Sequence, residues 1–70
     1  MKRFRQYQII EVIRDINPVI RQGFRGAILE MLDANTYIVE FVKEDATNWE
    51  YDGQATFDLK SMDIKEVNLF

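Results

Sequence analysis

Two glycines followed by two apolar stretches constrain the fold of this chain most. Gly23 and Gly26 lead into an apolar stretch at residues 27–32, and a second stretch at residues 36–42 is rich in β-branched and aromatic residues. The polar residues 33–35 between the two stretches suit a tight hairpin turn. We therefore predict the entry loop and central hairpin of a small, strongly bent β-sheet. Each glycine is expected to supply a positive φ or a close approach of two backbones.

The segment at residues 7–16 fits two structures. Isoleucine recurs through it at helical spacing, and Pro18 follows as a natural stop. Read as a strand, the same segment places Ile10 and Val12 on one face. The density of β-branched residues favours the extended state, so we predict a strand and keep a helix as the alternative.

The remaining segments are short and separated by turn signals. In the early loop at residues 17–25, Val19 and Ile20 are expected to cover the core. Asn35 suits a left-handed position in the central turn, and Asp52-Gly53 is a strong turn signal. After a polar loop at 43–48 we predict one extended stretch at 49–59, which the Asp52-Gly53 turn can split into short strands at 49–51 and 54–57. A helical turn at 59–62 and a last strand at 63–69 follow.

Together these segments indicate an all-β protein. Five short strands, a long early loop and one short helical turn before the last strand are typical of a small SH3-like barrel. If residues 7–16 were helical, an open α+β fold would result. The 70 residues are enough for a single domain, residues 1–70, in which residues 1–6 fray or lead in to the first strand.

The composition argues against several classes of function. The chain has no histidine and no cysteine, so the commonest catalytic bases, nucleophiles and soft metal ligands are missing. We therefore expect no enzyme, no bound metal and no cofactor. No apolar segment approaches the roughly 18 residues that a membrane span needs. We expect a cytoplasmic protein without a membrane partner.

Charge is distributed unevenly along the chain. The net charge is −3, but residues 1–26 carry six basic and two acidic side chains, whereas residues 27–70 carry three basic and ten acidic ones. Overall acidity disfavours sequence-independent binding of nucleic acid. It favours a basic protein partner through electrostatic complementarity.

The stretch at residues 19–28 resembles the motif of KOW domains, in which a basic residue and two spaced glycines lead into an apolar strand. The resemblance implies an RNA-binding module as the alternative function. In that case Arg21 and Arg25 would face a phosphate backbone, with help from Lys2, Arg3 and Arg5.

A longer resemblance covers about residues 7–67. The patterns Gly23-Phe24-Arg25-Gly26 and Tyr37-Ile38-Val39-Glu40-Phe41 are similar to those of a family of small bacterial proteins of unknown function with an SH3-like barrel. This chain departs from the family after Asp45, where Ala46 stands in place of the usual glycine. Members often look like partners of toxin-like proteins, so the resemblance implies an immunity or antitoxin role.

We therefore predict a protein-binding module that neutralises a partner, such as a basic toxin, by covering its active-site cleft. Trp49 is the aromatic residue expected to be most exposed and to anchor the contact. The predicted partner-binding residues are Glu40, Glu44, Asp45, Trp49, Glu50 and Asp52. Exposed edges of an incomplete barrel leave a homodimer open as an alternative.

Overall fold

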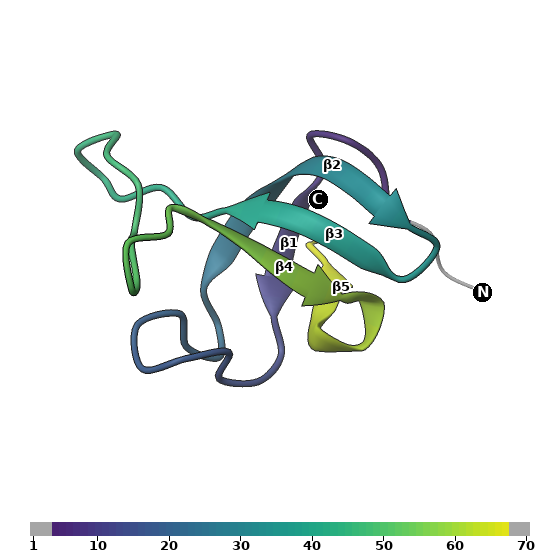
Figure 1. The fold of residues 1–70 in the computed structure, drawn as a ribbon, viewed down its shortest axis with the longest axis horizontal. Coiled ribbons are helices and arrows are strands. Elements are labelled where there is room, and N and C mark those ends of the chain that lie inside the picture. Colours follow the sequence, from purple (N-terminus) through teal and green to yellow (C-terminus); the bar gives the residue numbers. More distant parts are fainter. Residues whose placement is uncertain (1–3, 68–70) are drawn as a thin grey trace.

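The computed structural model describes residues 4–67 and contains one antiparallel sheet of five strands (Figure 1). The spatial order of the strands is β4-β3-β2-β1-β5. A single 3₁₀ turn, η1, precedes the last strand, and no α-helix occurs in the described residues. The elements are β1 (Ile9–Val12), β2 (Arg25–Asp33), β3 (Thr36–Glu40), β4 (Thr56–Lys60), η1 (Ser61–Asp63) and β5 (Ile64–Glu66).

The predicted all-β class, with five strands and a helical turn before the last of them, is confirmed. The helical alternative for residues 7–16 is wrong, because β1 occupies Ile9–Val12 and turns or bends surround it. Ile10 and Val12 are fully buried, whereas Ile9 is exposed. This alternation is what a strand with one face on the core requires.

Strand β2 pairs with both of its neighbours and holds the two halves of the sheet together. Its first residues pair with β1, as Ala27 does with Ile9, and its later residues pair with β3, as Met31 does with Tyr37. Register shifts between Ile28 and Glu30, and again between Met31 and Asp33, interrupt the β2–β3 ladder. Such irregularities increase the local bend and twist of a strand.

The two outer strands, β4 and β5, leave the sheet with two edges. Within residues 4–67, no ladder joins β4 to β5, and the connection between them is the short turn η1. The sheet is curved, and β4 keeps a free edge because its neighbour in the sheet is β3 alone.

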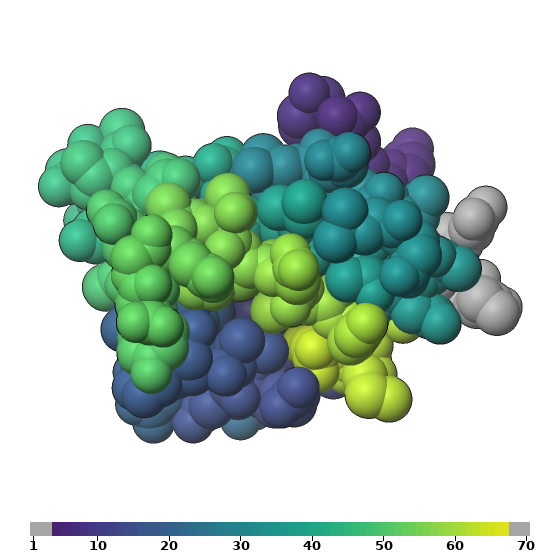
Figure 2. Space-filling view, viewed as in Figure 1, coloured from purple at the N-terminus to yellow at the C-terminus, as the bar shows by residue number. Residues whose placement is uncertain are grey.

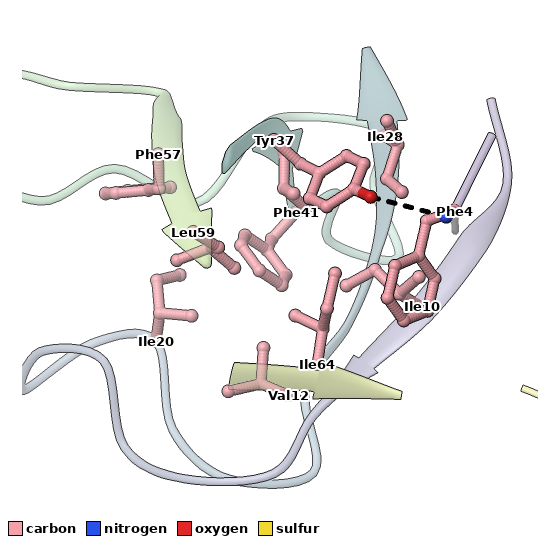
Figure 3. Close-up of a cluster of buried hydrophobic side chains, with 11 residues drawn as sticks. Phe4, Ile10, Val12, Ile20, Ile28, Tyr37, Phe41, Phe57, Leu59 and Ile64 are labelled. Carbon is pink, nitrogen blue, oxygen red and sulfur yellow. Dashed lines mark hydrogen bonds between the residues drawn. The ribbon is translucent and has the colours of Figure 1, made fainter. Parts of the chain in front are cut away.

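The core lies inside this curved sheet, where the inward side chains of all five strands meet (Figure 3). Two segments outside the strands also contribute to the core. Phe4, which precedes β1, packs edge-on against Tyr37 with ring centroids 5.5 Å apart. Ile20, in the early loop, is fully buried. The buried hydrophobic residues are Phe4, Ile10, Val12, Ile20, Ile28, Tyr37, Val39, Phe41, Phe57, Leu59 and Ile64.

The early loop, predicted at residues 17–25, spans residues 13–24 in the structure. It covers one end of the core, as predicted for Val19 and Ile20. The side chain of Asn17 accepts hydrogen bonds from the backbone nitrogens of both residues, each at 2.8 Å. Gly23, at φ +95°, donates a backbone hydrogen bond to Val12 at 2.8 Å. The loop therefore returns to the end of β1 before β2 begins.

Four predicted details are wrong. Residues 4–6 are not a frayed lead-in, because Phe4 belongs to the core. Asn35 lies in the β2–β3 turn without a left-handed φ. No strand forms at residues 49–51, where Tyr51 makes an isolated bridge with Gln54, and the following strand begins only at Thr56. The last strand ends at Glu66, and residues 68–69 of its predicted range lie outside the described part of the chain. Within residues 4–67, no helix has the length and apolar character needed to cross a membrane.

Candidate protein-binding surface

Most of the predicted partner-binding residues lie on the long connection between β3 and β4. This connection extends from the end of the sheet as two successive turns (Figure 1). We call its residues 43–54 the acidic loop. It carries four carboxylates and a single basic side chain, that of Lys43. The four carboxylate residues, all exposed, are Glu44, Asp45, Glu50 and Asp52.

The first turn of the acidic loop is held by its own side chains. The carboxylate of Asp45 accepts hydrogen bonds from the hydroxyl of Thr47 at 2.6 Å and from its backbone nitrogen at 3.0 Å. These bonds, the hydroxyl first, hold the pKa of Asp45 below its ordinary value. Ala46 adopts a φ of +72°, a left-handed backbone conformation that is uncommon outside glycine.

The second turn is the hairpin predicted from Asp52-Gly53. Both residues have positive φ, 52° and 77°, as a type I′ turn requires. Tyr51 and Gln54 exchange backbone hydrogen bonds of 2.9 Å on either side of the turn. Glu50 and Asp52 are thus displayed on a short, hydrogen-bonded loop.

Trp49 supports the acidic loop from below, and the prediction that it is the most exposed aromatic residue is wrong. Its ring is half-buried, with its centroid 5.3 Å from that of Phe24, and it packs against the core. The ammonium group of Lys43 lies 4.8 Å from the ring centroid on a cation–π contact. The ring is therefore already in contact with two side chains of the same molecule.

Glu40, another predicted partner-binding residue, lies at the end of β3, just before the acidic loop. It accepts a hydrogen bond of 3.4 Å from the side chain of Asn48.

A groove of about 650 Å³ runs beside the acidic loop, between the early loop and the outer edge of β4. Tyr51, which is 40% exposed, lies at the end formed by the Asp52-Gly53 hairpin. The view in Figure 2 shows β4 on the surface, with atoms of the early loop next to it. The groove-lining residues are Ile16, Asn17, Tyr51, Gly53, Gln54, Ala55, Thr56, Phe57 and Asp58.

Sequence reasoning missed this groove. The residues that line it come from segments about 40 residues apart, and no local sequence pattern predicts that these segments lie side by side. The one available signal was the strong turn at Asp52-Gly53, which places Tyr51 at the base of a hairpin.

The two main basic residues of the alternative function, Arg21 and Arg25, are engaged with carboxylates. Arg21 forms an ion pair with Asp15 at 3.0 Å, and Arg25 forms one with Glu11 at 3.2 Å. Arg5 is exposed, whereas Lys2 and Arg3 lie outside the described residues. The guanidinium groups that would face a phosphate backbone therefore each have an acidic side chain beside them.

Glu11 is the most connected of these carboxylates. It lies between Arg25 and Lys65, the latter at 3.4 Å, and so joins β1 to both neighbouring strands. The hydrogen bond from Arg25, followed by the charge of Lys65, holds the pKa of Glu11 below its ordinary value against the opposing effect of desolvation.

In the part of the chain that the structure describes, no group of three or more acidic side chains is placed to hold a metal ion. Comparison with protein-family models, with curated proteins and with solved structures gave no match.

Proposed function

We propose that this chain is a protein-binding module whose acidic loop docks on a basic surface of another protein. The observation that carries the proposal is the exposure of Glu44, Asp45, Glu50 and Asp52 on one hydrogen-bonded loop. The only cation of that loop, Lys43, is held against Trp49. Charges displayed in this way accelerate association with an oppositely charged partner and contribute to its selection.

The specific form that we propose is an immunity or antitoxin-type neutraliser that blocks its partner by steric occlusion. The support for this form is the sequence resemblance together with the acidity of the loop. A KOW-like nucleic-acid-binding role is the rival. The ion pairs of Arg21 and Arg25 count against it, because each guanidinium would have to exchange a carboxylate for a phosphate.

Single charge reversals test the acidic loop. The tagged chain would be used to capture its partner from nuclease-treated host lysate, and the affinity of the purified pair would then be measured. Glu44→Lys and Glu50→Lys should each weaken binding by about tenfold, because an attractive charge becomes a repulsive one. Both side chains are exposed and hold no turn together, so the fold should be retained.

Glu30→Lys is the matched control, since Glu30 is an exposed carboxylate on β2 and its reversal changes the net charge equally. This variant should bind within about twofold of the wild type. Equal affinity of all three variants would contradict the proposal. Retention of nucleic acid in an untreated sample, lost at high salt and reduced by Arg21→Ala, would favour the rival function.

A further inference from the structure

We propose that the free edge of β4 receives an extended, basic segment of the partner as an additional antiparallel strand. This inference rests on the proposed function, because it names how a basic partner would be held beside the acidic loop. Strand addition to an exposed sheet edge is a general mode of peptide recognition in which backbone hydrogen bonds supply affinity and alternate side chains supply specificity.

The hydrogen bonds at the end of β4 show which backbone groups face outward. The backbone nitrogen of Ser61 donates to Asn35 at 2.8 Å and so continues the β3 ladder, whereas that of Lys60 donates to the side chain of Asp63 at 2.9 Å. Backbone groups of an edge strand alternate between its partner and the free side. The backbones of Thr56 and Asp58 therefore point away from β3, and those of Phe57 and Leu59 point toward it.

These outward groups are available to a new strand. Within residues 4–67, no protein group bonds the outward backbone of Thr56 or Asp58. An added strand would gain about four hydrogen bonds there, since each directly opposed pair exchanges two. Asp63 already occupies the amide of Lys60 and thus ends the open edge at that side.

The groove beside β4 has room for such a strand. Besides β4, the groove is lined by Ile16 and Asn17 and by the hairpin residues Tyr51, Gly53 and Gln54. Along β4, Phe57 and Leu59 belong to the buried core (Figure 3). Asp58, between them, is exposed. Residues of the added strand would alternate in the same way, with one set toward Ile16 and the other beside Asp58.

Charge identifies the occupant as a basic segment of a partner and disfavours a second copy of this chain. A lysine or arginine opposite Asp58 would form a favourable cross-strand pair, with the carboxylates of Glu50 and Asp52 close along the chain. In a two-fold pairing of β4 with itself, Asp58 would lie opposite its counterpart or diagonally next to it. Like charges in these positions are destabilising. The register that places Asp58 opposite Lys60 would need the backbone nitrogen of Lys60, which already donates to Asp63. The expected ligand therefore alternates basic and apolar residues.

A synthetic peptide that alternates lysine and valine is the probe. We expect its addition to shift the NMR signals of the Thr56 and Asp58 amides and to slow their hydrogen exchange. A peptide that alternates glutamate and valine is the charge control and should bind at least about tenfold more weakly.

Methylation of selected peptide nitrogens tests the hydrogen bonds directly. The side chain of Asp58 lies on the outer face, and its backbone groups face the added strand. A peptide residue directly opposite Asp58 has its side chain on the same face and exchanges backbone hydrogen bonds with it. The lysines, which pair with Asp58 by charge, must therefore supply the backbone nitrogens that form these bonds. Methylating the lysine nitrogens should weaken binding by about tenfold or more, whereas methylating the valine nitrogens should leave it within about threefold. Equal effects of the two methylations, or shifts confined to the acidic loop, would overturn the inference.

Variants of the chain separate this inference from the proposed function. Thr56→Pro removes an outward amide without removing a β3 ladder bond, and Thr56→Val is the matched control that keeps the amide. We expect Thr56→Pro, and not Thr56→Val, to lose binding of the peptide and of the captured partner.

Three outcomes separate the two proposals. Loss of the partner in Glu44→Lys but not in Thr56→Pro would overturn strand addition and leave the acidic loop as the binding surface. Loss in Thr56→Pro but not in Glu44→Lys would overturn the acidic-loop proposal and support the edge. Protection of the same amides by self-association without peptide would overturn the inference in favour of a second copy.

Discussion

At Gly26 the absence of a side chain lets β2 lie against the end of β3. A Cβ at this position would be 2.5 Å from the backbone oxygen of Glu40 and 2.8 Å from the ring of Phe41. Gly23 is required for a different reason, since its φ is +95° and the space around it is open. Gly26 therefore meets the predicted need for a close approach of two backbones, and Gly23 meets the predicted need for a positive φ.

Asparagine and alanine substitutions distinguish these two requirements. Gly26→Ala should lower the free energy of unfolding by about 2–3 kcal/mol through overpacking, and Gly26→Asn should lower it further. At Gly23 the order should reverse, with asparagine better than alanine, because asparagine tolerates a positive φ. Urea unfolding of the four variants measures the effect. The same order at both sites would contradict this explanation.

Among the elements, η1 depends on the buried carboxylate of Asp63. This residue is 3% exposed, and its carboxylate accepts hydrogen bonds from Arg14 Nε at 2.5 Å and from the backbone nitrogen of Lys60 at 2.9 Å. Its own backbone oxygen accepts a bond of 2.9 Å from Ile13. The turn between β4 and β5 is thereby fastened to the end of β1. Arg14 gains a partner in the same contact, which raises its pKa.

We expect Asp63→Asn to lower the free energy of unfolding by about 2–3 kcal/mol, because the amide group cannot replace both charged hydrogen bonds. Asp58→Asn is the control: it makes the same chemical change on the neighbouring strand β4, where the side chain is exposed. It should stay within about 0.5 kcal/mol of the wild type. Chemical denaturation measures both variants, and equal losses would contradict a special role for Asp63.

For the whole molecule, small size makes individual contacts count. A domain of this length is stabilised by only a few kcal/mol, so single contacts of the kind at Gly26 or Asp63 are a large fraction of the total. The outer face of the sheet is joined by the ion pairs of Glu11 with Arg25 and Lys65. Within residues 4–67, in contrast, the carboxylates of the acidic loop form no such ion pair, and the ammonium group of Lys43 lies over the ring of Trp49.

The pH dependence of stability should contain a component from Glu11. Because the folded-state pKa of Glu11 is lowered, its contribution is complete above its ordinary pKa and is lost as the pH falls through the lower, folded value. The melting temperature of Glu11→Gln should therefore lie below that of the wild type at pH 7, and the gap should close in acid. A gap that is constant from neutral to acidic pH would show that the ion pairs do not stabilise the fold.

The sequence by itself determined the strand-forming segments, the turns with local chemical signals and the acidity of the 43–54 loop. The density of β-branched residues favoured a strand at β1, and Asp52-Gly53 identified a hairpin turn, because both signals are local. Burial of Phe4, which the position in the chain did not suggest, depends on contact with the distant Tyr37.

Only the tertiary structure decided which aromatic rings are covered and which edge is open. Trp49 borders a polar loop in sequence, yet Phe24 and Lys43 cover it in space. The groove beside β4 exists because Ile16 and Tyr51, far apart in the chain, are brought to the same place by sheet order. Local preferences act over a few residues, whereas exposure and the availability of backbone groups depend on which distant segments pack together.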